Sequence, residues 1–196
     1  MKHETTSPLS IGYAFSGSFC TVKYAIEAMK TLTEQHRVTP IFSEAAQTIN
    51  TRFGKAEAIM KEIEAISGNH AIKTIAEAER IGPEKLFDIL VIAPCTGNTL
   101  SKLSLGIIDS TVAMAAKAHL RNARPLLLAI ASNDALSVGL RHIGALTLRK
   151  NIFFVPFGQD DPFEKPTSLI ADFSKIPKAI SAAMENKQLQ PILLGS

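Results

Sequence analysis

The chain has 196 residues, of which 46% are hydrophobic, and this is enough for one globular domain with a full core. Its net charge of +3 comes from interleaved basic and acidic residues, which argues against a nucleic-acid-binding face. No apolar segment approaches the roughly 18 residues of a membrane span, and the polar N-terminus has no signal core, so a cytoplasmic protein is predicted. Cys20 and Cys95 form no CxxC pair and the histidines are scattered, so no metal site is expected.

Strand and helix patterns alternate in the first half of the chain. Residues 11–15 predict a strand, and apolar residues at helical spacing between 19 and 32 predict the helix that follows it. Residues 38–42 predict the second strand, and residues 56–66 a helix that Gly68 stops. Between 69 and 87 we expect a short strand at 71–75 and helical turns.

The second half continues the alternation. Residues 89–93 form a continuous apolar run, typical of a strand buried on both faces, and helices are predicted at 98–105 and 111–121. A strand at 126–131 leads to Ser132, which is expected to cap a helix ending near 148. The remaining predicted elements are a last strand at 152–155, a loop at 156–169, a helix at 176–185 and flexible tails at 1–8 and from about 187. Together these elements predict one α/β domain, residues 1–196, with a mostly parallel sheet.

Four polar turns follow the predicted strands. They are Ser16-Gly17-Ser18, Ser43, the segment Thr96 to Thr99, and Ser132-Asn133. Right-handed crossovers place the carboxyl ends of all strands on one edge, where helix N-termini favour anions. These turns predict a pocket for a phosphorylated ligand, although a tight turn with capping serines would explain each one alone. Neither GxGxxG nor a P-loop is present, which argues against NAD(P) in this turn and against an NTPase.

Three motifs carry a resemblance to a known family. They are SGS after the first strand, Ser43 after the second, and APCTGNTLSKLSLGIID at 93–109. With these motifs, residues 9–155 resemble the flavoprotein family that includes flavin-dependent cysteine decarboxylases and flavin prenyltransferases. The resemblance implies a flavodoxin-like (Rossmann-like) three-layer α/β/α sandwich that binds FMN. The implied cofactor-binding residues are Ser16, Gly17, Ser18 and Ser43 for the phosphate, Thr96, Asn98 and Thr99 for phosphate or ribityl groups, and Ser132 and Asn133 where the decarboxylases carry a Met-Asn substrate clamp.

Longer phrases narrow the resemblance to one branch of this family. AEAERIGPEKLFDILVIAPCTGNTLSKL, MAAKAHLRNARPLLLAIASNDALS and KNIFFVPFGQDDPFEKPTSLIADF are similar to the B subunits of dipicolinate synthases from spore-forming bacteria. This implies an oxidoreductase subunit that helps oxidise a dihydrodipicolinate-type dicarboxylate to dipicolinate in the mother cell during sporulation. It also implies a partner, the A subunit of the same synthase, with NAD(P) bound through that partner only, and a homo-oligomer. The alanine-rich helix at 111–119 would then be either a subunit contact or a helix packed on its own sheet.

The resemblance leaves the chemistry open. The clamp has become Ala-Ile-Ala-Ser-Asn at 129–133, and His70, the nearest counterpart of the decarboxylases' catalytic histidine, lies in a Gly-Asn-His turn, so no catalytic residue is assigned. Arg141, Lys150 or Lys102 could meet the substrate's carboxylates. Two alternatives remain: a non-catalytic subunit that retains a phosphate pocket, and a decarboxylase or prenyltransferase.

Overall fold

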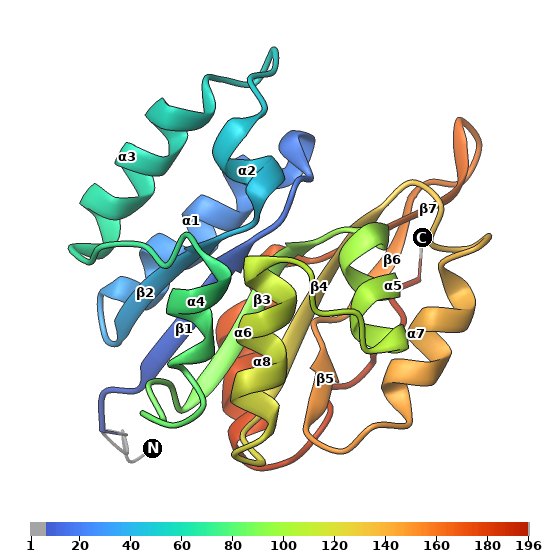
Figure 1. Cartoon of the computed structure of the whole chain (residues 1–196). Coiled ribbons are helices and arrows are strands. Elements are labelled where there is room, and N and C mark those ends of the chain that lie inside the picture. Colours follow the sequence, from blue (N-terminus) through green and yellow to red (C-terminus); the bar gives the residue numbers. More distant parts are fainter. Residues whose placement is uncertain (1–6, 196) are drawn as a thin grey trace.

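The computed structural model describes residues 7–195, in which a seven-stranded sheet forms the centre of the molecule (Figure 1). Five strands run parallel in the order β2-β1-β3-β4-β5, and an antiparallel hairpin, β6 and β7, joins β4. The strands are β1 (Ser10–Phe15), β2 (Arg37–Phe42), β3 (Ile89–Cys95), β4 (Leu126–Ser132), β5 (Ile152–Phe154), β6 (Phe157–Asp161) and β7 (Lys165–Ala171).

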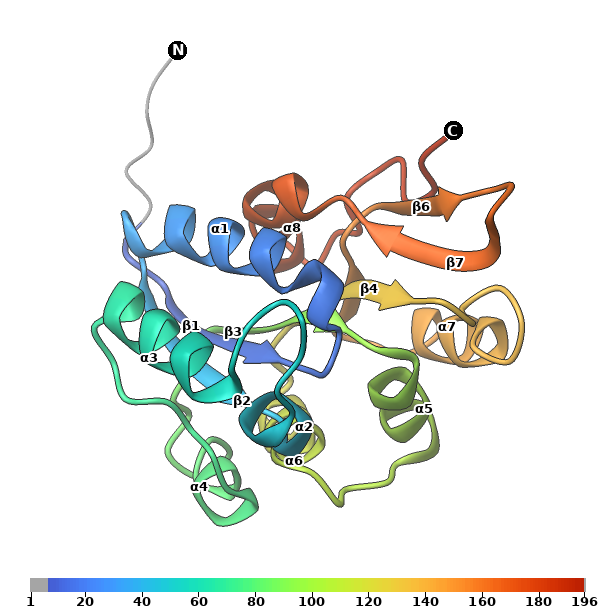
Figure 2. The same cartoon turned by 90° about the horizontal axis from the view of Figure 1, so that it is seen from above.

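Helices cover both faces of the sheet, which confirms the predicted three-layer α/β/α fold (Figure 2). The helices α1 and α8 lie on one face, and α5, α6 and α7 lie on the other. The α-helices are α1 (Val22–Thr33), α2 (Glu44–Thr48), α3 (Ala56–Ser67), α4 (Ile75–Glu79), α5 (Gly97–Leu105), α6 (Thr111–Leu120), α7 (Leu140–Thr147) and α8 (Ile176–Met184); short 3-10 helices are η1 (Phe19–Thr21) and η2 (Phe173–Lys175). Between residues 7 and 195, no helix has the length and apolar character needed to cross a bilayer.

The sequence explains why β3 lies at the centre. All seven of its residues are buried, as expected for a parallel strand with helices on both faces. Its neighbour β1 approaches it closely at Gly12, where an added Cβ would lie 2.6 Å from the Phe87 ring and 2.8 Å from the Leu90 side chain. A residue without a side chain at position 12 therefore leaves room for these two core groups.

Three predicted elements differ in the structure. Residues 71–75 make only an isolated bridge, from Ile72 to Ile41 of β2. Ser132 does not cap a helix but ends β4, where it pairs with Leu169 of β7, so that α7 starts only at Leu140. The expected loop at 156–169 is largely the β6–β7 hairpin. In each case long-range pairing decides the conformation, which local sequence patterns do not report.

The segment after residue 187 contacts the body of the domain. Gln188 exchanges hydrogen bonds with the backbone of Phe154, at 2.8 and 2.7 Å. The backbone of Phe157 accepts from Leu194 at 2.9 Å and donates to Ile192 at 3.0 Å. The sequence predicts a flexible tail from about residue 187; these contacts place residues 188–194 beside β5 and β6, and their mobility stays a prediction.

A buried histidine makes stability depend on pH. His119 of α6 is 1% exposed, and its Nε2 lies 2.9 Å from the carbonyl oxygen of Pro125. Burial lowers the pKa of His119 to about 4 from its ordinary 6.5. The unfolded chain therefore binds a proton at a higher pH than the folded chain, so His119 stabilises the fold above about pH 6.5 and this contribution is lost as the pH falls towards 4.

We expect His119 to account for a loss of about 3 kcal/mol in the free energy of unfolding between pH 7 and pH 4. Denaturant unfolding of the natural chain and of His119→Gln over this range checks the prediction, because the carboxylates that titrate there are common to both proteins. Parallel pH profiles for the two proteins would contradict it.

Candidate functional site

The candidate site begins where β1 and β3 lie side by side, at the point where the strand order reverses. Open α/β sheets bind ligands in the crevice beyond such a switch point. Ser16, which follows β1, is 5% exposed, and its Oγ donates to the carbonyl oxygen of Pro94 at 2.6 Å and accepts from the backbone N–H of Thr96 at 3.1 Å. The Ser16 side chain therefore holds the two polar turns together.

The second turn opens α5. The Oγ1 of Thr96 caps this helix by accepting from the backbone N–H of Thr99 at 3.3 Å, and it lies 3.1 Å from the Thr99 Oγ1. The N–H groups of Gly97 and Asn98 are the first of the helix and have no intrahelical acceptor. They are suited to bind an anion or a hydroxyl at the carboxyl edge of the sheet.

The end of β4 closes the site from the other side. The Ser132 hydroxyl donates to the carboxylate of Asp134, and both side chains lie close to Gly97. An added Cβ at Gly97 would lie 2.6 Å from the Ser132 Oγ and 2.7 Å from an Asp134 carboxylate oxygen. Glycine at position 97 thus allows the β4 end to approach the start of α5.

Asn133 connects this edge to the hairpin. Its backbone oxygen accepts from the Thr167 Oγ1 at 2.7 Å, and its side-chain oxygen lies 3.4 Å from the Ser168 Oγ of β7. The hairpin therefore forms a wall of the site.

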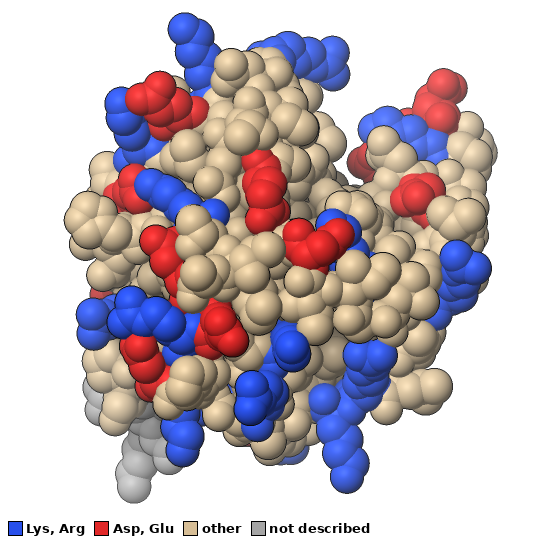
Figure 3. Space-filling view, viewed as in Figure 1, with Lys and Arg blue, Asp and Glu red and all other residues tan. Residues whose placement is uncertain are grey.

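These elements surround a cavity of about 440 Å³, which we call the edge cavity. Its volume falls within the range of roughly 300–1,000 Å³ that is usual for small-molecule sites. Figure 3 shows this region as a hollow between the part of the molecule that carries α2 and α3 and the part that carries the hairpin. Among the residues that line it are Gly17, Ser18, Cys20, Phe53, Thr96, Gly97, Ser132, Asn133, Asp134, Asp160 and Ser168.

The predicted cofactor-binding residues divide into two groups. Gly17, Ser18, Thr96, Ser132 and Asn133 line the edge cavity. The other four do not: Ser16 and Thr99 are buried behind its wall, Ser43 caps α2 by accepting from Ala46 N–H at 3.3 Å, and Asn98 lies exposed on α5.

Charge in the edge cavity is negative. Asp134 and Asp160 line it, and Asp160 is paired with Lys165 at 2.7 Å, whereas no lysine or arginine of the described chain lines it. Sequence reasoning missed Phe53, Asp134, Asp160 and Ser168. Phe53 and the hairpin residues enter the site through the tertiary arrangement of loops, for which the sequence gives no local signal.

The three basic residues considered for the substrate's carboxylates lie elsewhere. Lys102 is paired with Asp109 at 2.8 Å, and the Arg141 Nε lies 3.3 Å from the His142 Nε2 on α7. Lys150 lines a groove next to the amino end of β5. The structure therefore does not bring these cations to the edge cavity.

The two cysteines and His70 also differ in position. Cys20 is exposed and lines the edge cavity, whereas Cys95 is fully buried, and burial raises the pKa of the Cys95 thiol. His70 is exposed and follows Asn69, whose side chain donates to Val38 near the start of β2. It therefore lies away from the carboxyl edge of the sheet.

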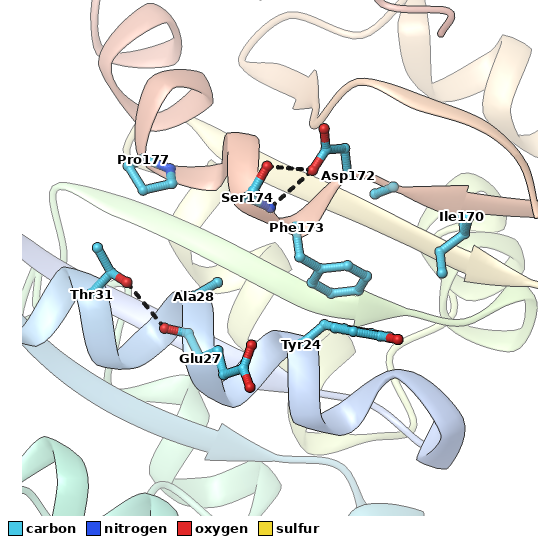
Figure 4. A pocket seen from close by; sticks show the side chains of 10 residues that line it. Tyr24, Glu27, Ala28, Thr31, Ile170, Asp172, Phe173, Ser174 and Pro177 are labelled. Atoms are coloured by element: carbon cyan, nitrogen blue, oxygen red, sulfur yellow. Dashed lines mark hydrogen bonds between the residues drawn. The ribbon is translucent and has the colours of Figure 1, made fainter. Parts of the chain in front are cut away.

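A second groove lies between α1 and η2 (Figure 4). The rings of Tyr24 and Phe173 form its wall, with their centroids 6.3 Å apart. Two of its hydroxyl groups bond locally: the Thr31 Oγ1 donates to the Glu27 backbone oxygen at 3.2 Å, and Ser174 donates to the Asp172 carboxylate. The Thr31 and Ser174 hydroxyls are therefore engaged by neighbouring residues of their own segments.

Comparisons with known proteins agree with this geometry. The flavoprotein family model matches residues 2–185. The dipicolinate synthase B subunit of Bacillus subtilis (strain 168) is 44% identical over 185 residues, which cover 94% of this chain and 92% of that protein. The crystal structure of the dipicolinate synthase B subunit from Bacillus halodurans has a TM-score of 0.88 at 38% identity, covering 97% of this chain and 98% of that one.

A more distant structure shares the fold alone. The FMN-dependent cysteine decarboxylase SpaF has a TM-score of 0.62 at 21% identity, with coverage of 92% of this chain and 97% of that chain. The match of the family model over nearly the whole chain, together with the 44% identity, is decisive. The chain belongs to the flavoprotein family and is a homologue of the dipicolinate synthase B subunit.

Proposed function

We propose that this protein binds FMN in the edge cavity and, together with a partner of the dipicolinate synthase A type, oxidises a dihydrodipicolinate-type intermediate to dipicolinate. The observation that carries the proposal is the junction of the two polar turns at the switch point, held by the Ser16 Oγ between Pro94 and Thr96. NAD(P) would act only through the partner, and the naming of the relatives as B subunits supports the existence of such a partner.

The residues present fit FMN. Free N–H groups at the start of α5 and the hydroxyls of Ser18 and Thr96 offer donors to phosphate and ribityl oxygens. Gly17 leaves the first turn without a side chain, and an added Cβ there would lie 3.2 Å from the Ala45 Cβ. Ala131 of β4 and Leu169 of β7 offer apolar surfaces for a flat ring.

The chemistry requires the loss of a hydride and a proton from the dihydropyridine ring, which leaves the aromatic product. When bound, FMN supplies the acceptor for the hydride. The chain's own residues bind and orient: the β1 and β3 turns fix the cofactor end, and the β4 end and the hairpin wall set where the substrate ring lies. Asp134, a carboxylate hydrogen-bonded to Ser132 at this wall, is placed to accept the proton.

The test is a titration of the purified protein with FMN, read by flavin fluorescence and absorbance and repeated with riboflavin. We expect FMN to bind at least about tenfold more tightly than riboflavin, because a charge-assisted set of phosphate contacts is worth more than about 1.4 kcal/mol. Equal affinity for the two would contradict a phosphate site at the turns. Absence of binding, with or without the A-type partner, would favour a non-catalytic role.

A further inference from the structure

The lining of the edge cavity lacks the positive charge that the substrate class proposed above requires. The dihydropyridine dicarboxylate and its aromatic product each carry two negative charges, while Asp134 and the lysine-paired Asp160 are the charged residues of the lining. Ions of like sign repel strongly where water is excluded. A substrate of this class therefore needs a cation from just outside the lining.

The loop between α2 and α3 carries one. Phe53, which lines the edge cavity and is 37% exposed, lies beneath the guanidinium of Arg52, whose Cζ is 4.9 Å from the ring centroid. Arg52 is exposed, and within residues 7–195 no carboxylate lies within ion-pair distance of it. Its charge is therefore available to an anionic ligand.

The loop is built to hold this pair of side chains. Thr51 and Gly54 exchange backbone hydrogen bonds at 3.0 and 3.1 Å, so that residues 51–54 form a closed turn with Arg52 and Phe53 at its tip. The Thr51 Oγ1 accepts from the Phe53 N–H at 3.1 Å, and the Asn50 side chain anchors the turn by accepting from the Ala56 N–H at 2.9 Å. A turn fixed in advance loses less conformational freedom when it binds a ligand.

We propose that Arg52 and Phe53 form the recognition element for the aromatic dicarboxylate, an inference that rests on the proposed function. The guanidinium of Arg52 binds a ring carboxylate through two parallel N–H donors, and the Phe53 ring packs against the heterocycle. In Figure 1 the loop between α2 and α3 and the hairpin rise on opposite sides of the carboxyl edge of the sheet. Because Phe53 lines the edge cavity and the Arg52 guanidinium lies over the Phe53 ring, the cation stands beside the cavity.

The probe that tests this is pyridine-2,6-dicarboxylate, titrated calorimetrically into the full chain with and without saturating FMN. We expect Arg52→Gln to weaken its binding by about tenfold or more and Arg52→Lys to give an intermediate loss, because lysine keeps the charge but not the bidentate geometry. The matched control is Lys55→Ala, an exposed cation of the same loop, which should leave the affinity unchanged. Pyridine-2-carboxylate should show a smaller difference between the natural chain and Arg52→Gln.

Three results would overturn the inference: unchanged affinity in Arg52→Gln, an equal loss in Lys55→Ala, or no binding of the dicarboxylate by the natural chain in either state. FMN affinity should be the same in Arg52→Gln as in the natural chain. The two proposals can therefore fail independently. The FMN titration of the natural chain tests FMN binding, and the dicarboxylate titration without FMN tests the role of Arg52.

Discussion

The Gly97→Val substitution is expected to weaken FMN binding by about tenfold to a hundredfold, because overpacking of this kind costs about 1–3 kcal/mol. The first atom of the new side chain would lie 2.6 Å from the Ser132 Oγ and 2.7 Å from Asp134, closer than non-bonded atoms can approach. Either the start of α5 or the end of β4 must then move, and both edges of the edge cavity move with them. FMN titration of the variant measures the effect.

Gly144→Val is the matched control. Gly144 lies in α7, where an added Cβ meets nothing within 4 Å, so this variant should bind FMN like the natural chain. Circular dichroism and the unfolding midpoint of Gly97→Val should show a folded protein, because the affected contacts lie at the surface edge of the sheet. Natural FMN affinity in folded Gly97→Val would show that this junction is not part of the binding site.

The largest expected effect on stability is that of Phe15→Ala, which should lower the free energy of unfolding by about 3–5 kcal/mol. Phe15 ends β1 and is 1% exposed. Its ring stacks on Phe42 of β2, with centroids 5.5 Å apart, and lies 5.1 Å from the Tyr13 ring. Removal of the ring leaves a cavity under the Ser16 turn, because close-packed neighbours relax only partially into the space.

Denaturant unfolding at a fixed protein concentration measures this loss, and an unchanged denaturant slope would show that the comparison is valid. Phe163→Ala is the control, since Phe163 lies at the hairpin tip and is 92% exposed; it should change stability by less than about 0.5 kcal/mol. Similar losses for the two variants would contradict the packing described for Phe15.

The sheet could be predicted from the sequence where burial is continuous or periodic. Residues 89–93 are apolar without interruption, and in the structure they form most of β3, buried on both faces. The apolar residues spaced along 22–32 form the buried side of α1. Such patterns are local consequences of burial, so the α/β class follows from them, and the fold is confirmed. The family resemblance rests instead on the polar turn motifs.

The hairpin could not be predicted in this way. Residues 156–169 contain three prolines and several charges. Burial in β6 and β7 is confined to the ends of the strands away from the hairpin tip, at residues such as Phe157 and Leu169. Their strand conformation depends on the pairing of β7 with β4 and of β6 with β7. Much of the edge cavity's wall comes from this hairpin and from the loop at Phe53, so the sequence predicts the β1 and β3 turns but not the walls opposite them.

The edge of β4 is shared between two partners, and this arrangement separates the scaffold from the wall of the site. Residues Leu126 to Leu128 pair with β5, while Ala131 and Ser132 pair with β7. On this edge, the amino-terminal half of β4 thus pairs only with the parallel strand β5, and the carboxyl-terminal end pairs only with the hairpin strand β7. Changes of length or sequence in β6 and β7 can accordingly reshape the wall of the edge cavity without altering the pairing of the five parallel strands, so that ligand choice can change while the parallel sheet stays the same.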